Sequence, residues 1–216
     1  TNCGLCAERC PSGALQNTLR TVTSEEVMDE IKKSVIFYDT SDGGVTFSGG
    51  EPLLQPEFLK ELIEKCNEDD IHITLDTSGY ADPDTFKSIV DDIDLFLYDL
   101  KIVNDDIHRK YTGTSNEMIL ENLKTLSKRG KEVIIRFPVI PGITDTEENL
   151  DDITNFLSDL KHIKEIDLLP YHNVEEKYNN LGKEYKLEEA SSLNEKSVQD
   201  IKDRFEKEGF LVKEGG

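Results

Sequence analysis

The sequence predicts an α/β fold built on a parallel sheet, and two observations lead to that prediction. Short segments rich in β-branched and aromatic residues alternate along the chain with amphipathic helical segments. Strands separated by such helices pair in parallel through crossover connections, because antiparallel neighbours need only a tight turn. Polar residues also follow the strands where each one ends, which is the edge where parallel sheets bind ligands.

The first predicted elements are a helix, a strand and a second helix. A capping box at Thr23–Glu26 begins a helix that runs to about Phe37. The segment Val45–Phe47 alternates with a period of two and ends at the glycines of Ser48–Gly50, as a strand entering a turn does. Pro56 then suits the first turn of an amphipathic helix.

The middle of the chain repeats this alternation twice. Ile71–Leu75 is the next predicted strand, and Asp82–Pro83 supplies an N-cap followed by a proline at the first helical position. Leu95–Tyr98 returns as a strand. Apolar residues across Met118–Leu126 have helical spacing, and Gly130 closes this helix.

The C-terminal part begins with the β-branched run Val133–Arg136, which we expect Pro138 and Pro141-Gly142 to stop. Thr144 with Glu147 is expected to cap a helix that continues through Leu160. The last predicted elements are a strand at Ile163–Leu169, a helix at Asn194–Glu208 and a short strand at Phe210–Val212.

Composition excludes several classes of protein. The 45 acidic and 25 basic residues give a formal charge of −20, which repels nucleic-acid phosphates and anionic lipid headgroups. No apolar run reaches the roughly 20 residues that span a bilayer, and the chain does not begin with a signal-peptide pattern. A composition that is 36% apolar can bury a core. We therefore expect a soluble, cytoplasmic protein, and we take a monomer as the default oligomeric state.

Three of the four cysteines crowd the first ten residues as Cys3-x2-Cys6-x3-Cys10, followed by Pro11. This spacing matches the ferredoxin run C-x2-C-x2-C-x3-C-P if the first cysteine of the run falls just before Thr1. We interpret these cysteines as iron–sulfur ligands of a chain cut upstream, in which neither of two clusters is complete. A zinc knuckle is the alternative, but no further ligand lies close enough in sequence to complete it.

The cysteines also divide the chain into two unequal parts. Residues 1–20 are expected to be the remnant of a ferredoxin-type segment, and residues 21–216 form one domain without a linker. The fourth cysteine, Cys66, lies among apolar residues of a predicted helix, where a buried and inert thiol is expected.

The candidate site residues lie at the ends of five successive predicted strands, so they can converge on one edge of the sheet. They are Gly49, Gly50, Glu51, Asp76, Thr77, Asp99, Lys101, Arg136 and His172. Taken singly, Asp76 can form an Asx turn, Asp99 can pair with Lys101, and His172 can bond within the core. Arg136 is harder to explain, because a guanidinium in an apolar strand needs a carboxylate or a ligand beside it.

The motifs occur in an order that resembles a known family. After the ferredoxin-type cysteines come VTFSGGEP at 45–52, LDTSG at 75–79, DLK at 99–101, Ile135-Arg136 and LPYH at 169–172. This order resembles the radical S-adenosylmethionine activating enzymes of glycyl-radical enzymes, of which pyruvate formate-lyase activating enzyme is the best-known relative. The cysteines resemble those of the subtype with a ferredoxin-type two-cluster insert, and the resemblance covers essentially the whole chain.

The resemblance implies a fold, a reaction and partners. The fold is a partial (β/α)6 TIM-like barrel, here lacking its first strand, with helices outside a parallel sheet. A [4Fe-4S] cluster holds S-adenosylmethionine, and one electron from a flavodoxin or ferredoxin cleaves it to a 5′-deoxyadenosyl radical. The radical takes a hydrogen from a backbone glycine of a glycyl radical enzyme, so the intact parent is an oxidoreductase whose substrate is a protein.

The resemblance also implies roles for the candidate residues, in three groups. The first group, which meets the methionine ammonium, is Gly49, Gly50 and Glu51. The second group lines the rest of the cofactor and consists of Asp99, Lys101, His172 and Arg136, with Arg136 facing the cofactor carboxylate or the substrate. The third group, which holds a monovalent cation, is Asp76, Thr77 and Asp99. These groups suit a zwitterion that also carries a sulfonium.

One motif of the family is missing. The radical-generating C-x3-C-x2-C pattern does not occur, and the cysteines at 3, 6 and 10 have the two spacings in the opposite order. We therefore expect this chain alone to be inactive. The alternatives are a different radical S-adenosylmethionine enzyme acting on a small molecule, a non-catalytic iron–sulfur or partner-binding module, and a metal-dependent barrel hydrolase using Asp76, Asp99 and His172.

Overall fold

A computed structural model describes residues 21–41, 43–171 and 195–215 and contains a six-stranded sheet. Every neighbouring pair of strands is parallel, and the strands lie side by side in the order in which the chain visits them. The strands are β1 Gly44–Phe47, β2 His72–Thr77, β3 Leu95–Asp99, β4 Glu132–Val139, β5 Glu165–Pro170 and β6 Leu211–Glu214. The predicted α/β class with a parallel sheet is confirmed.

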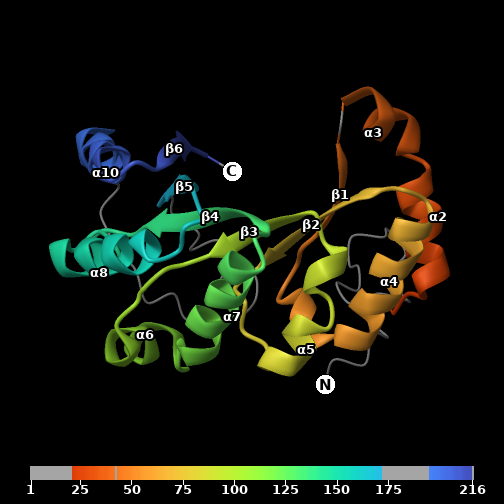
Figure 1. Cartoon of the computed structure of the whole chain (residues 1–216), viewed down its shortest axis with the longest axis horizontal. Coiled ribbons are helices and arrows are strands. Elements are labelled where there is room, and N and C mark those ends of the chain that lie inside the picture. Colours follow the sequence, from red (N-terminus) through yellow and green to blue (C-terminus); the bar gives the residue numbers. More distant parts are fainter. Residues whose placement is uncertain (1–20, 42, 172–194, 216) are drawn as a thin grey trace, which may run out of the picture.

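Helices connect the strands, as the crossover argument requires. They are α2 Ser24–Lys32, α3 Val35–Ser41, α4 Pro56–Glu68, α5 Pro83–Lys87, α6 Asp105–Thr112, α7 Glu117–Lys128, α8 Glu147–Ser158 and α10 Glu195–Lys207, with 3-10 turns η1 Pro52–Leu54 and η2 Val90–Asp92. In Figure 1, α5, α6 and α7 lie below the strands, and β1 and β6 stand at opposite ends of the sheet. This sequential parallel order is that of an incomplete barrel. No helix of the described ranges is both long and apolar enough to cross a membrane.

The two faces of the sheet differ in burial. Along β4, Val133, Ile135 and Phe137 are buried, whereas the alternate residues Ile134 and Arg136 are only half-buried. The same alternation runs along β3. Since side chains alternate between faces along a strand, one face packs on the helices and the other is partly open. We call the second one the inner face, and it carries Arg136.

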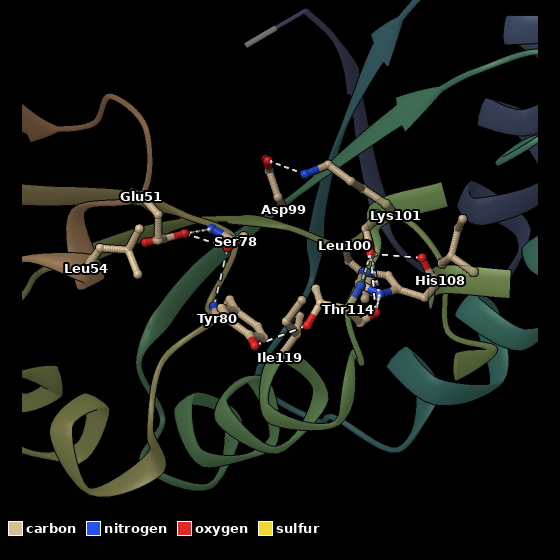
Figure 2. Close-up of a pocket in the computed structure, with 12 residues that line it drawn as sticks. Glu51, Leu54, Ser78, Tyr80, Asp99, Leu100, Lys101, His108, Thr114 and Ile119 are labelled. Carbon is tan, nitrogen blue, oxygen red and sulfur yellow. Dashed lines mark hydrogen bonds and ion pairs between the residues drawn. The ribbon is translucent and has the colours of Figure 1, made fainter. Parts of the chain in front are cut away.

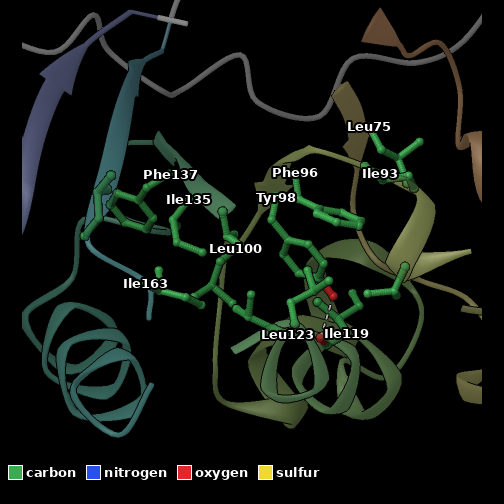
Figure 3. Close-up of a cluster of buried hydrophobic side chains, with 14 of the residues drawn as sticks. Leu75, Ile93, Phe96, Tyr98, Leu100, Ile119, Leu123, Ile135, Phe137 and Ile163 are labelled. Carbon is green, nitrogen blue, oxygen red and sulfur yellow. Dashed lines mark hydrogen bonds between the residues drawn. The ribbon is translucent and has the colours of Figure 1, made fainter. Parts of the chain in front are cut away.

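The helix-facing side of the sheet forms the core (Figure 3). Phe96 and Tyr98 of β3 pack there with Leu123 of α7, and all three side chains are buried. The Tyr98 hydroxyl donates a 2.6 Å hydrogen bond to the carbonyl of Ile119. A Cβ on Gly79 would lie 1.7 Å from that hydroxyl, so the glycine leaves the space that Tyr98 fills.

Several local predictions are confirmed. Thr23 forms both halves of the capping box with Glu26. Asp82 caps α5 by accepting from the amide of Thr85, and Pro83 follows at the first helical position. Cys66 is fully buried, with its sulfur 3.7 Å from that of Met28.

The first predicted helix, Ser24–Phe37, is wrong in extent, because the structure breaks it into α2 and α3 around Ser34. Helix α2 buries Met28 and Ile31, whereas Ile36 and Phe37 of α3 stay 76% and 70% exposed. The apolar spacing does not continue on one buried face, so the two halves need not share an axis.

Near β4, one predicted boundary is partly wrong and the predicted cap of α8 is wrong. Of the two predicted stops of the strand, Pro138 lies within it, opposite Leu169 of β5, but the strand does end at Val139, before Pro141-Gly142. The cap of α8 is Thr146, which accepts from the amide of Asn149. Thr144 is instead buried and donates to the carbonyl of Pro138, so it holds the turn after the strand.

Helix α6 was not predicted. Asn104 caps it through the amide of Ile107, and Gly113 ends it in the left-handed region. Its only buried residue is His108, so the sequence has no apolar stripe of helical spacing to reveal it.

Candidate functional site

The carboxyl ends of β1 to β4 bring eight of the nine predicted site residues around one cavity of about 260 Å³. They are Gly49, Gly50, Glu51, Asp76, Thr77, Asp99, Lys101 and Arg136, joined by Ser48 and Ser78. The ninth, His172, and the cysteines Cys3, Cys6 and Cys10 lie outside the described residues. The convergence expected from the strand ends is therefore observed for the described residues, while their individual roles stay predictions.

Arg136 lies at the centre of the charged groups in this cavity. Its Nη1 is 2.6 Å from Asp76 Oδ1, and its Nε is 3.7 Å from Asp99 Oδ1. The Lys101 ammonium lies 3.0 Å from the other oxygen of Asp99. The carboxylate that Arg136 was expected to need is thus supplied from the neighbouring strands, and Asp99 does pair with Lys101. Two cations and two anions alternate within one cavity.

Two polar atoms of this group have no hydrogen-bond partner. Asp99 Oδ1 and Arg136 Nε are both buried, and 3.7 Å is too long for a bond between them. Buried polar atoms are normally paired, so each unpaired one needs an explanation. One acceptor and one donor side by side fit a ligand that carries groups of both kinds.

The Glu51 carboxylate holds the loops around the cavity together. Its Oε1 accepts from Thr77 Oγ1 at 2.6 Å and from the amide of Leu53 at 3.2 Å. Its Oε2 accepts from both the amide and the hydroxyl of Ser78. Four donors therefore occupy the two oxygens, and Glu51 clamps the β2 loop to the start of η1.

The two glycines before Glu51 expose backbone to the cavity. Gly49 has φ +135°, a conformation that a side chain would strain, and a Cβ at either glycine would contact nothing within 4 Å. Packing does not require glycine here, but access to the backbone does. A ligand can approach the peptide groups of Gly49 and Gly50 closely.

A second cavity of about 300 Å³ adjoins the first, because Glu51, Ser78, Asp99 and Lys101 line both (Figure 2). Its other walls include His108, which is not among the nine predicted site residues. The imidazole Nδ1 lies 2.9 Å from the carbonyl of Thr114, which fixes the ring. A lone histidine in a polar helix gave no signal that the fold would bring it here.

Two features argue against a divalent metal at the described part of the site. The described residues contain no group of three or more His, Cys, Asp or Glu side chains that could hold a metal ion. Asp76 and Asp99 already face the cations Arg136 and Lys101.

Among the described cysteines, Cys66 is buried, and desolvation raises the pKa of its thiol to about 11, which disfavours the thiolate that a metal needs.

Comparison with known proteins identifies the class of protein. A family model described as the Radical SAM superfamily matches residues 2–156, so the chain belongs to that superfamily. The trans-4-hydroxy-L-proline dehydratase activating enzyme of Clostridioides difficile is 40% identical over 209 residues, which cover 93% of this chain and 69% of that protein. The pyruvate formate-lyase-activating enzyme of Clostridium pasteurianum is 35% identical, covering 89% of this chain and 82% of the relative.

The chain spans only about two thirds of the length of some relatives. The 4-hydroxyphenylacetate decarboxylase activating enzyme of Clostridioides difficile (strain 630) is 37% identical, and the match covers 93% of this chain but 64% of that protein. Among solved structures, a domain of pyruvate-formate lyase-activating enzyme from Bacteroides vulgatus ATCC 8482 superposes with a TM-score of 0.68 at 31% identity. That match covers 81% of this chain and 99% of the domain, and it supports the partial-barrel fold.

Membership of this superfamily implies S-adenosylmethionine and a [4Fe-4S] cluster as cofactors. The described residues fit the first, since its amino acid part carries an ammonium and a carboxylate and the cavity offers both charge types and an unpaired acceptor, Asp99 Oδ1. The described residues supply no thiolates for the cluster, because the cysteines at 3, 6 and 10 lie outside them.

Proposed function

We propose that this chain is part of a glycyl-radical-enzyme activating enzyme. The observation that carries this proposal is the identity of 35% to 40% with several activating enzymes across about nine-tenths of the chain. The reaction is the removal of a hydrogen atom from a backbone glycine of a partner enzyme. A radical S-adenosylmethionine enzyme acting on a small molecule would not explain why the relatives named above, at this identity, are activating enzymes.

When bound, S-adenosylmethionine and a reduced cluster supply a 5′-deoxyadenosyl radical as the hydrogen acceptor. The chain's own residues bind and orient the cofactor. Gly49 and Gly50 present backbone groups to the methionine ammonium, because the Glu51 carboxylate is occupied by four donors. Lys101 and Arg136 face the methionine carboxylate, and Asp99 Oδ1 accepts from a cofactor donor.

Asp76 and Thr77 contribute in other ways. Asp76 accepts from the Ser48 hydroxyl at 2.8 Å and pairs with Arg136, so it orients the guanidinium toward the cavity. Together with Thr77 and Asp99 it is our predicted site for a monovalent cation beside the methionine carboxylate. His172 is predicted to line the same cofactor. A rigid polar site of this kind holds the reacting groups without reorganisation.

The wider setting of the reaction also stays a prediction. A flavodoxin or ferredoxin is the proposed reductant, and a local basic patch would have to offset the formal charge of −20 for an acidic protein to dock. We further predict a monomer in the cytoplasm.

The proposal is tested by comparing this chain with one extended upstream through the next cysteines. Both are reconstituted with iron and sulfide without oxygen, and iron content, the electron paramagnetic resonance signal and 5′-deoxyadenosine formation are measured after reduction. We expect a cluster and cofactor cleavage only in the extended chain. The extended chain should also transfer a hydrogen atom from the glycine Cα of a peptide to the 5′-deoxyadenosyl radical, so that deuterium placed on that Cα appears in the 5′-deoxyadenosine formed.

Cleavage by this chain alone would contradict the expected inactivity. No cluster in either chain would remove the support for the proposed activity and would favour a non-catalytic partner-binding module.

A further inference from the structure

Three buried side-chain atoms without a hydrogen-bond partner lie on three consecutive strands. They are Asp99 Oδ1 on β3, Arg136 Nε on β4 and Asp167 Oδ1 on β5, out of four such atoms in the described residues. The strand register places Asp99 opposite Arg136 and Arg136 opposite Asp167. Register partners in a parallel pair point to the same face, so the three side chains form a row across the inner face.

Asp167 is the member of this row that the cofactor pocket does not use. It does not line either of the two cavities at the strand ends, although Arg136 beside it lines one. Its side chain is only 8% exposed. Lys213 on β6 is the register partner of Asp167, but its ammonium pairs with Glu165, at 2.5 Å, and not with Asp167. Burial, followed by the charge of Glu165, raises the pKa of the Asp167 carboxyl.

A carboxyl group in this state is costly for folding. A buried polar atom that makes no hydrogen bond loses its hydration without compensation, and a charge loses more. Packing gives no reason to keep an aspartate here, since Ile166 and Leu168 on either side are buried on the opposite face. Residues that lower stability in this way are characteristic of binding sites.

The pattern of the row indicates the chemistry of the ligand. With Asp99 Oδ1 assigned to the cofactor, the rest of the row offers an acceptor, the Asp167 carboxylate, beside a donor, the Arg136 Nε–H. A polypeptide backbone presents the complementary series of N–H donors and C=O acceptors. The half-buried inner-face residues around the row leave part of the sheet surface open for such a segment.

We propose that Asp167 is a substrate-binding residue, which accepts a hydrogen bond from a backbone N–H of the polypeptide that enters the barrel next to the cofactor. Arg136, through its Nε–H, binds a carbonyl of the same segment. This inference rests on the proposed function, because it requires a polypeptide substrate. The alternative ligand for the Asp167 carboxylate is a hydroxyl group of the cofactor, and the experiment separates the two.

The test measures peptide and cofactor binding separately. The protein is the cluster-loaded chain extended upstream, without reductant, and the probe is a blocked heptapeptide with one central glycine among alanines. Peptide affinity is measured with S-adenosylmethionine present, and cofactor affinity without peptide. We expect Asp167→Ala to weaken the peptide about tenfold, as loss of a hydrogen bond to a charged group does, and to leave the cofactor affinity unchanged.

Backbone substitution identifies the hydrogen bond itself. Analogues of the peptide in which one amide at a time is replaced by an ester lack a single N–H. One analogue should bind the unmutated protein about tenfold more weakly than the parent peptide but lose little further affinity with Asp167→Ala. Asp167→Asn keeps an acceptor oxygen and should recover part of the affinity.

The stability of the protein distinguishes a binding role of Asp167 from a structural one, because the two roles predict opposite changes in denaturant unfolding. Asp167→Ala should unfold at the same or a higher denaturant concentration than the unmutated protein, because an unpaired buried carboxyl is removed. Glu132→Gln, which changes an exposed carboxylate at the amino end of β4, is the matched control for both measurements.

Two results would overturn the inference. Unchanged peptide affinity in Asp167→Ala would exclude the proposed contact, and a loss of cofactor affinity instead would assign Asp167 to the cofactor. Failure of the proposed function is distinguishable, because it would appear in the unmutated protein as neither peptide binding nor formation of 5′-deoxyadenosine after reduction.

Discussion

Arg136 on β4 reaches past β3 to contact Asp76 on β2, with 2.6 Å between Nη1 and Oδ1. Both side chains are about three-quarters buried, at 24% and 22% exposure. Because Asp99 on the intervening strand also faces the guanidinium, one cation offsets two carboxylates. The contact therefore ties the carboxyl ends of three strands together around the cavity.

Arg136→Ala should destabilise the protein, because it leaves Asp76 and Asp99 facing each other without their shared cation. We expect a loss of about 2–3 kcal/mol in the free energy of unfolding, somewhat below that of a fully buried broken pair. Denaturant unfolding measures it. Arg129→Ala is the control, since its pair with Asp91 lies at the surface and should contribute less than about 1 kcal/mol. Equal losses for the two variants would contradict the structural role given to Arg136.

The sequence predicted the order of strands and the edge where the site forms. Both follow from local patterns, such as Val45–Phe47 ending in glycines or Leu95–Tyr98 ending at Asp99. The pairing of Asp76 with Arg136 could not be predicted, because side chains two strands apart meet only through the curvature of the sheet. His108 was missed because α6 has no apolar stripe that would predict the helix. Only tertiary contacts place its imidazole at the second cavity.

Other predictions failed where the local sequence allows more than one structure. Thr144 and Thr146 both precede the acidic start of α8, and the structure uses the second as the cap and buries the first. The row that contains Asp167 was not predicted either. A single aspartate between Ile166 and Leu168 has no special pattern, and only the strand register shows that it lies beside Arg136.

Glu51→Gln should loosen the loop that follows β2. An amide has one acceptor oxygen, so it cannot satisfy the donors from Thr77, Ser78 and Leu53 together. We expect a loss of about 2 kcal/mol in the free energy of unfolding, and faster hydrogen exchange at the Ser78 amide. Glu57→Gln, an exposed change on α4, should alter neither. Retained protection at Ser78 would show that the carboxylate does not clamp the loop.

Gly79→Ala should be among the most damaging small substitutions in the chain. The new Cβ would lie 1.7 Å from the Tyr98 hydroxyl and 2.1 Å from Cζ, on a residue with φ +72°. We expect a loss of more than about 3 kcal/mol, from overpacking added to backbone strain. Gly113→Ala separates the two causes, since its φ of +83° is similar but its Cβ meets only open space. That control should lose about 1 kcal/mol in thermal or denaturant unfolding. A similar loss at both positions would mean that Tyr98 moves aside.

Asp105 makes part of the stability depend on pH. Hydrogen bonds from Arg109 and Ser115 and from the amide of Asn116 lower the pKa of its carboxyl to about 2 in the folded protein. An unfolded aspartate has a pKa of about 4, so the stabilisation is complete above that pH and is lost as the pH falls from about 4 through about 2.

Asp105→Asn should therefore lower the unfolding temperature at neutral pH, and its difference from the unmutated protein should shrink as the pH falls through that window. Thermal unfolding followed from pH 7 to the lowest pH at which the fold persists measures this convergence. Asp106→Asn, an exposed change on the same helix, controls for the net charge. A difference between Asp105→Asn and the unmutated protein that stays constant as the pH approaches about 2 would show that the amide replaces the carboxylate contacts in a way that does not depend on ionisation.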